Sequence, residues 1–273
     1  MSKLIKDSLS ISAGFTAVAG TTMTITGTTM HDIVPGYSWW FYLLLLIALF
    51  LVCAALVYAA LRASCMKGIS LKVGSNAVSI VQGDLFEKDG WKVIPFNERF
   101  DTAVDDITIA KSSLNGVFIT NYVSDLAALK EEINKAENTT LSTVRESDGT
   151  IRYDLGYIKR FEDEYLLLAF THFDEQQRAH LSMSDYELCL MNMWRELSRT
   201  YAGKPINLPL LGSGITRFDD VPEKTFDDLL RCMICTLRAT GETFDSVITI
   251  VLTKEAWKDV HPYELKGFAA NGI

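Results

Sequence analysis

Residues 38–61 read SWWFYLLLLIALFLVCAALVYAAL, and no Asp, Glu, Lys or Arg occurs between Ile33 and Leu61. As a helix, this charge-free run of about 29 residues reaches roughly 43 Å, more than the roughly 30 Å hydrocarbon core of a bilayer. The run is too long, and lies too far from Met1, to be a cleaved signal peptide. It is therefore predicted to span a membrane. The alternative, a buried core helix of a soluble protein, is disfavoured by the length of the run.

The preceding segment, residues 8–30, is also free of charge but rich in Thr and Gly. Its summed insertion free energy is near zero, so hydropathy alone does not decide whether it crosses the membrane. Basic residues flank the two segments, whereas the connection between them has none. The positive-inside rule then predicts a helical hairpin with spans at about 9–30 and 38–62 and both termini in the cytoplasm. The alternative is an interfacial or disordered leader over residues 8–30.

Residues 67–273 have a different composition, with mixed charge and regular apolar patterns, and are enough for one domain with a full core. The chain has a formal net charge of −8, which argues against unspecific nucleic-acid binding. Its five cysteines form no disulfide framework, which fits a reducing, cytosolic compartment. Cys232 and Cys235 make a CxxC inside a predicted helix without a second ligand pair, so two buried thiols are expected and no metal site.

Apolar, β-rich stretches alternate with helical patterns along this domain. Strands are predicted near 77–82, 91–96, 116–119, 165–171, 205–211 and 246–252. Helices are predicted at about 125–136, at 185–201 with Ser184 and Glu187 as a capping box, and from Pro222 onward. The polar stretch 138–153 is typical of an excursion or an exposed hairpin. The alternation predicts an α/β domain of three layers.

The sequence LPLLGSGITRF at 208–218 follows a predicted strand and precedes a predicted helix. Small residues here let backbone N–H groups approach an anion, and the dipole of the next helix adds positive potential. Such a loop is expected to bind a diphosphate. The alternative interpretation is an ordinary tight turn that binds no ligand. The loop is not a nucleophile elbow, because Leu211 and Ile215 stand where that motif requires glycine. It is not a P-loop, because no Gly-Lys-Ser/Thr follows.

A second motif, Gly83-Asp84-Leu85, is followed by the strand-like run WKVIPFN at 91–97. Together with the Pro209–Gly214 loop, this spacing resembles a macro domain over about residues 70–255. In that family an Asp after the first glycine takes the adenine amino group, an Asn at the end of the next strand lies near the distal ribose, and the glycine-rich loop wraps the diphosphate. The resemblance implies these roles for Asp84, Asn97 and the loop, and it implies a mixed central sheet.

The diphosphate loop has one residue more between its proline and its first glycine than the family pattern. The chain also departs from hydrolytic macro domains after the Asn: their Asn-Ala-Ala-Asn and Gly-Gly-Gly runs are replaced by NERF at 97–100 and SSLNG at 112–116. The second departure puts de-ADP-ribosylating activity in doubt.

The order of N-terminal spans (membrane region 1–66) and divergent macro domain (67–273) resembles the membrane effector of type II Thoeris antiphage systems. The resemblance implies a multi-pass protein of the bacterial inner membrane. It also implies that a TIR-domain partner makes an ADP-ribose-derived signal, expected to be histidine-ADP-ribose, which the macro domain captures. Binding is then expected to drive homo-oligomerisation and disruption of the lipid bilayer, without nucleic acid, metal or other cofactor.

The ligand site is expected to combine three groups: a carboxylate that binds the edge of the nucleobase, backbone amides that bind the diphosphate, and Arg217, which binds a terminal negative group. The sequence offers no nucleophile paired with a general base. Alternatively, Arg217 caps the turn or pairs with Asp219 or Asp220, and Asp84 is a turn residue. No catalytic residue is assigned. Alternative functions are a membrane-tethered hydrolase of ADP-ribose conjugates, with Asn97 placing a water, and a scaffold that binds no nucleotide. The expected ligand-binding residues are Asp84, Leu85, Asn97, Ser113, Leu114, Gly116, Leu211, Gly212, Ser213, Gly214, Ile215, Thr216, Arg217 and Phe218.

Overall fold

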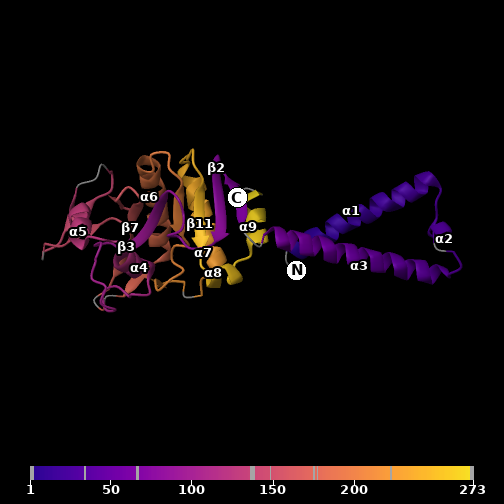
Figure 1. Cartoon of the computed structure of the whole chain (residues 1–273), viewed down its shortest axis with the longest axis horizontal. Coiled ribbons are helices and arrows are strands. Elements are labelled where there is room, and N and C mark those ends of the chain that lie inside the picture. The colour runs from indigo at the N-terminus through magenta and orange to yellow at the C-terminus, as the bar shows by residue number, and fades with distance from the viewer. Residues whose placement is uncertain are drawn as a thin grey trace. The chain divides into compact units, whose positions relative to one another are not determined.

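A computed structural model of the chain describes residues 3–270 except 34, 66, 67, 136–138, 148, 175, 177 and 222. The chain divides into two units, which are described separately below (Figure 1). The first unit consists of Met1–Ile69 and His261–Phe268. The second unit consists of Ser70–Val260 and Ala269–Ile273.

The first unit is helical. The long helices α1 (Lys3–Thr26) and α3 (Trp39–Ser64) pack against each other and are joined through the short α2 (Met30–Ile33), as Figure 1 shows. Near the connection, His31 Nδ1 and Tyr42 Oη lie 2.9 Å apart and share a hydrogen bond. Most of the segment 8–30 is therefore helical, and an interfacial helix stays an alternative to a span.

Among the described helices, α3 is the one that is long and apolar enough to cross a membrane, with a mean hydropathy of 2.9. Its length and composition agree with the span predicted at 38–62. α1 does not reach that hydropathy, because Ser, Thr and Gly occupy much of its length. The hydroxyls of Thr21, Thr22 and Thr24 each donate to the carbonyl four residues earlier at 2.9 Å, which satisfies these donors within the helix. The second span stays a prediction.

The C-terminal helix α9 (Pro262–Ala270) groups mainly with the first unit, whereas the sequence suggests one domain over all of 67–273. Within the first unit, Tyr263 Oη of α9 donates a hydrogen bond to Asp7 Oδ2 of α1 at 2.8 Å. Desolvation and this carboxylate raise the pKa of Tyr263 to about 12, so the phenol keeps its proton at neutral pH.

The second unit contains one mixed sheet, which has nine strands in the described part of the chain. The order is β1-β2-β11-β9-β3-β7-β8-β10, and β6 pairs with β7. The central strands β2, β11, β9, β3 and β7 are parallel, whereas β6 and β8 are antiparallel to β7. The bounds are β1 (Ile69–Val73), β2 (Asn76–Gln82), β3 (Trp91–Asn97), β6 (Ile158–Phe161), β7 (Tyr165–Phe173), β8 (Ala179–Leu181), β9 (Ile206–Pro209), β10 (Arg217–Phe218) and β11 (Ile248–Leu252).

Helices cover both faces of this sheet, which confirms the three-layer α/β prediction. One face packs an aromatic cluster around Phe118 beneath α4 and α5. On the other face, Phe170 of β7 contacts Tyr186 of α6, and Trp194 Nε1 of α6 donates to Thr236 Oγ1 of α7 at 3.1 Å. The bounds are α4 (Leu114–Asn121), α5 (Leu126–Asn134), α6 (Met183–Thr200), α7 (Phe226–Thr240) and α8 (Lys254–Asp259).

Three local predictions need correction. Residues 116–119, predicted as a strand, lie in α4, because Ser113 caps that helix by accepting from Gly116 N at 3.0 Å. α6 is capped by Ser182, which accepts from Asp185 N, and not by Ser184. α7 begins at Phe226 with a capping box between Thr225 and Asp228; Pro222 lies outside the described residues. Within 138–153, β4 (Thr143–Arg145) and β5 (Ile151–Tyr153) form the exposed hairpin.

Candidate functional site

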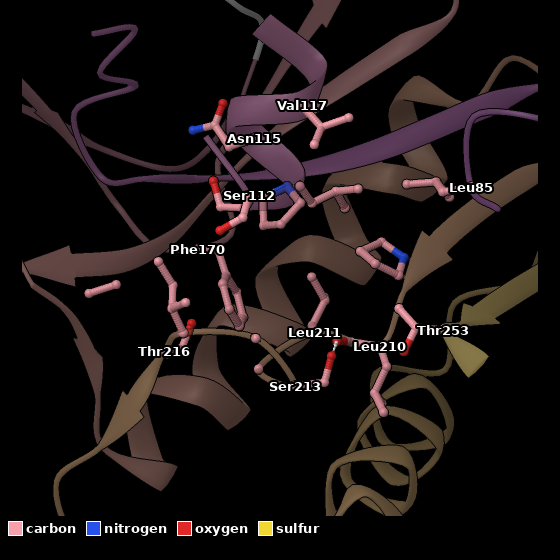
Figure 2. Close-up of a pocket in the computed structure, with 18 of the residues that line it drawn as sticks. Leu85, Ser112, Asn115, Val117, Phe170, Leu210, Leu211, Ser213, Thr216 and Thr253 are labelled. Carbon is pink, nitrogen blue, oxygen red and sulfur yellow. Dashed lines mark hydrogen bonds between the residues drawn. The ribbon is translucent and has the colours of Figure 1, made fainter. Parts of the chain in front are cut away.

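A cavity of about 720 Å³ opens at the common carboxyl end of the five parallel strands (Figure 2). The chain passes from β3 to β7 in one direction and from β9 to β11 in the other, so strand order reverses between the neighbours β3 and β9. Open α/β sheets bind ligands in the crevice at such a point. The walls come from segments at all five strand ends, mainly residues 82–85, 95–97, 170–171, 209–216 and 253–256.

The loop after β9 lines this cavity and contains backbone N–H groups that have no acceptor among the described residues. Gly212 has a φ of 81°, in the left-handed region that glycine adopts readily. Ser213 Oγ donates to Leu210 O at 2.6 Å and braces the turn. The N–H groups of Gly212, Gly214 and Ile215 have no acceptor within the described chain. The free N–H groups agree with the turn that the glycine-serine-glycine pattern predicts, and anion binding by it stays a prediction.

The start of α4 forms the opposite wall. Figure 2 shows Ser112 and Asn115 on the α4 side of the cavity and Leu211 and Ser213 on the other side. The first N–H groups of the helix, on Leu114 and Asn115, have no acceptor within the described chain, and the helix dipole adds positive potential at this end. The cavity is therefore lined from two sides by groups that favour an anion.

Two polar residues expected to contact the ligand also support the local backbone. Asp84 lines the cavity, and its Oδ1 accepts from Phe86 N at 2.9 Å, so the turn role is present. Asn97 lines the cavity too, but its Oδ1 accepts from Arg99 N and Asp101 N, each at 3.1 Å. Asn97 Nδ2 donates to Asp101 Oδ2 at 2.7 Å. The Asn97 carboxamide therefore already organises the loop that follows β3.

The structure brings most of the expected ligand-binding residues to the cavity. Lining residues among them are Asp84, Leu85, Asn97, Ser113, Leu114, Leu211, Gly212, Ser213, Gly214, Ile215 and Thr216. Gly116, Arg217 and Phe218 do not line it. Gly116 packs so closely under Ala110 that a Cβ would lie 2.2 Å from Ala110 O. Arg217 and Phe218 form β10, which pairs with β8 and thereby points Phe218 into the core and leaves Arg217 exposed.

The first turn of α8 is a cavity wall that the motifs do not reveal. Thr253, Lys254, Glu255 and Ala256 line the cavity, and Thr253 caps α8 by accepting from Ala256 N at 3.2 Å. Lys254 is the one Lys or Arg among the described lining residues, a position that the sequence suggested for Arg217. These residues could have been predicted from the strand at 246–252, because the residues that follow each parallel strand lie at this edge of the sheet.

Glu98, next to Asn97, is buried and shares a hydrogen bond of 2.6 Å with His172 Nδ1. This bond, outweighing the desolvation of the ring, raises the pKa of His172. Asp185 raises it further and Arg152 lowers it, and the His180 ring lies 5.9 Å away. The pair fixes the ends of β3 and β7 beside the cavity.

We expect this pair to make stability depend on pH. Because the folded-state pKa of His172 is raised, its contribution is complete below about pH 6.5 and is lost as pH rises through the folded-state pKa. The melting temperature of Glu98→Gln should therefore fall further below wild type at pH 5.5 than at pH 8.5, measured on full-length protein in detergent. Glu164→Gln, which removes a partner of Lys92, is the control with a pH-independent difference. A Glu98→Gln difference that is constant across this range contradicts the assignment.

The described residues include no group of three or more His, Cys, Asp or Glu that could hold a metal ion. Burial raises the pKa of Cys232 to about 12 and also raises that of Cys235, so both thiols of the CxxC in α7 are protonated at neutral pH. Neither thiol belongs to the cavity lining.

The chain is similar to known proteins. Residues 78–253 match the family model described as "Thoeris protein ThsA, Macro domain". The chain is 37% identical over 242 residues to Thoeris protein ThsA of Bacillus amyloliquefaciens (strain Y2), covering 85% of this chain and 80% of that protein. The chain belongs to the ThsA family. A solved structure, the Oceanobacillus iheyensis macrodomain with MES bound, is similar at 14% identity and a TM-score of 0.43, covering 76% of this chain and 98% of that one.

Membership of the ThsA family confirms the resemblance drawn from the motifs and identifies the second unit as a macro domain. The chain is accordingly a Thoeris effector of antiphage defence. Macro domains generally bind ADP-ribose derivatives, and a ThsA effector implies a signal that comes from a TIR-domain partner.

Proposed function

We propose that the macro domain senses an ADP-ribose-derived signal made by a TIR partner, with histidine-ADP-ribose as the expected ligand, and that binding drives homo-oligomerisation and disruption of the bacterial inner membrane. The observation that carries the proposal is the pairing of two sets of unpaired backbone N–H groups across one cavity. Asp84, Asn97 and the 211–216 loop are the proposed contacts for base, distal ribose and diphosphate.

Local groups must outweigh the charge of the whole chain. A net charge of −8 repels a dinucleotide-like anion at long range. Within the cavity, the amides after Gly212, the start of α4 and Lys254 supply positive potential at contact distance, where screening is weak. The volume of about 720 Å³ also falls in the usual range for small-molecule sites.

Binding is favoured over hydrolysis because the described lining residues include no His or Cys that would form a nucleophile and base pair. Ser113 and Ser213 donate their hydroxyls to the carbonyls of Ala110 and Leu210, at 2.7 and 2.6 Å. The alternative function is a membrane-tethered hydrolase of ADP-ribose conjugates. It requires Asn97 to place a water, although its carboxamide is already engaged in the chain.

In the proposed membrane arrangement α3 is a span and α1 is the second span of a hairpin, with both termini in the cytoplasm. The chain connects the cavity lining to this hairpin. The first turn of α8 lines the cavity, and Val260 and His261 join α8 to α9. In α9, Tyr263 donates a hydrogen bond to Asp7 of α1. Shifting an equilibrium from 1:99 to 99:1 needs about 5.5 kcal/mol of differential affinity for the assembled form.

The test is mass spectrometry of small molecules released from full-length protein purified after co-expression with its TIR partner. The proposal requires an intact ADP-ribose conjugate, absent when the partner is omitted. A cleaved product accumulating with time supports the hydrolase, and no nucleotide at all supports a scaffold. Either of these two results contradicts sensing by an intact ligand.

Asp84→Asn is expected to weaken binding of ADP-ribose about 10- to 100-fold, the usual range for a hydrogen bond to a charged acceptor. The carboxamide oxygen still accepts from Phe86 N, so the turn and the melting temperature should stay near wild type. Calorimetry on full-length protein measures the loss. Asp89→Asn, an exposed change outside the cavity lining, is the matched control and should bind normally.

A further inference from the structure

The ammonium group of Lys224 lies over the ring of Phe218, with Nζ 4.0 Å from the ring centroid. Within the described residues, Lys224 forms no hydrogen bond or ion pair in addition to this contact. Three other lysines lie over aromatic rings in the described chain, and each of them also donates to a carboxylate or a carbonyl: Lys92, Lys159 and Lys204. Lys224 is therefore a half-buried cation whose contact is with an aromatic ring and not with an anion.

Acidic residues close to Lys224 in the sequence do not neutralise this charge. Asp219 Oδ2 shares a hydrogen bond of 3.0 Å with His180 Nδ1, and Asp228 is occupied in the capping box of α7. Burial lowers the pKa of Lys224, and no neighbouring carboxylate raises it in return. In a chain with a net charge of −8, this position keeps a positive charge that the described residues leave without a counter-ion.

The ring of Phe218 connects Lys224 to the loop after β9. A Cβ added to Gly212 would lie 3.1 Å from Phe218 Cζ, so the edge of the ring packs against this glycine. The Tyr186 ring meets Phe218 at a centroid distance of 5.4 Å, and its Oη donates to Leu211 O at 3.0 Å. Two buried aromatic rings therefore support the cavity-lining loop from the interior, and the ammonium group is separated from Gly212 by one of them.

We propose that Lys224 strengthens diphosphate binding without touching the ligand: its charge acts on the phosphates across the Phe218 ring, from the interior side of the loop. The packed aromatic side chains screen this charge less than water does. Lys224 is not a lining residue, so it adds a second cation to the site beside Lys254. The inference rests on the proposed function, since it places the diphosphate at the 211–216 loop.

The test compares Lys224→Met with wild type by calorimetry on full-length protein in detergent, with ADP-ribose and adenosine as probes. Methionine keeps a flexible apolar chain against Phe218 and removes the charge. Affinity for ADP-ribose should fall about three- to tenfold, because one positive charge near the diphosphate is lost. Affinity for adenosine, which has no phosphate, should stay within about twofold. Lys224→Arg keeps the charge and the contact with the ring, so it should bind ADP-ribose nearly as wild type does.

Lys204→Met is the matched control. Lys204 Nζ lies 4.7 Å from the centroid of Trp91, but it pairs with Asp163 and precedes β9, at the opposite edge of the sheet from the cavity. This variant should bind both probes normally. Raising the salt concentration from about 0.1 to about 1 M should narrow the difference between wild type and Lys224→Met, because salt screens a charge effect. A difference caused by distortion of the loop would persist at high salt.

Three results would each overturn the inference: normal ADP-ribose binding by Lys224→Met, an equal loss of affinity for adenosine, or failure of Lys224→Arg to bind. Lys224→Gln is a second uncharged variant if methionine disturbs the packing. Normal binding by Lys224→Met together with weak binding by Gly212→Val overturns this inference and leaves the proposed function standing. Failure of wild type to bind ADP-ribose overturns both.

Discussion

Replacing Gly212 by valine is expected to reduce affinity for ADP-ribose and its conjugates at least 100-fold. Gly212 has a φ of 81°, which a β-branched residue does not adopt without strain. A Cβ at this position would also lie 3.1 Å from Phe218 Cζ and 3.4 Å from Leu229 Cδ2, both in the packed interior. The loop must therefore move, and the free N–H groups of Gly212, Gly214 and Ile215 move with it. Two lost hydrogen bonds to phosphate account for about 3–6 kcal/mol.

The same substitution should lower the free energy of unfolding by about 1–3 kcal/mol, so binding and stability must be measured together. Gly214→Ala is the matched control two residues away. Its φ is not positive, and a Cβ there meets no atom within 4 Å. The alanine variant should melt like wild type and keep measurable binding. Normal ADP-ribose binding by Gly212→Val would show that the loop after β9 is not the diphosphate site.

The loop after β9 could be placed at the cavity because its signal lies in the backbone: a run of small residues at a strand end indicates a turn with free N–H groups, and Gly212 and Gly214 supply them. Binding of a diphosphate by this loop stays a prediction. Arg217 could not be placed in the same way. The Arg217 side chain lies outside the cavity because β10 pairs with β8. This pairing joins two short strands that are far apart in the sequence, so no local pattern predicts it.

Asn115 and Lys254 were missed for a related reason. The apolar run VFIT at 117–120 suits a buried strand as well as a buried helix, and it took the Ser113 cap to decide for α4. Only with that helix in place does Asn115 fall in the first turn beside the cavity. α8 is six residues long and follows β11 directly, so it is too short for a helical pattern of apolar residues to predict it.

The tie between α9 and α1 also lay beyond sequence reasoning. Asp7 and Tyr263 are separated by 256 positions, and neither belongs to a motif. Composition, by contrast, indicated the apolar helix well, because insertion into lipid depends on summed side-chain hydropathy and not on pairwise contacts. The same additivity does not decide whether α1 spans the membrane, since the insertion free energies of its apolar and polar residues nearly cancel.

The double substitution Leu46→Arg and Leu49→Arg is expected to release the protein from the membrane fraction. The apolar residues of the span favour insertion by roughly 4–7 kcal/mol, and two central arginines in place of leucines oppose it by about 6–8 kcal/mol. One arginine would not suffice. Carbonate extraction of cells expressing the full-length chain measures the retained fraction. Leu46→Val with Leu49→Val keeps the segment apolar and should stay in the pellet. Because the insertion free energy of α1 is near zero, α1 is not expected to compensate for the loss of the α3 span. Membrane retention of the double-arginine protein would contradict this expectation and show that α1 anchors the chain independently of α3.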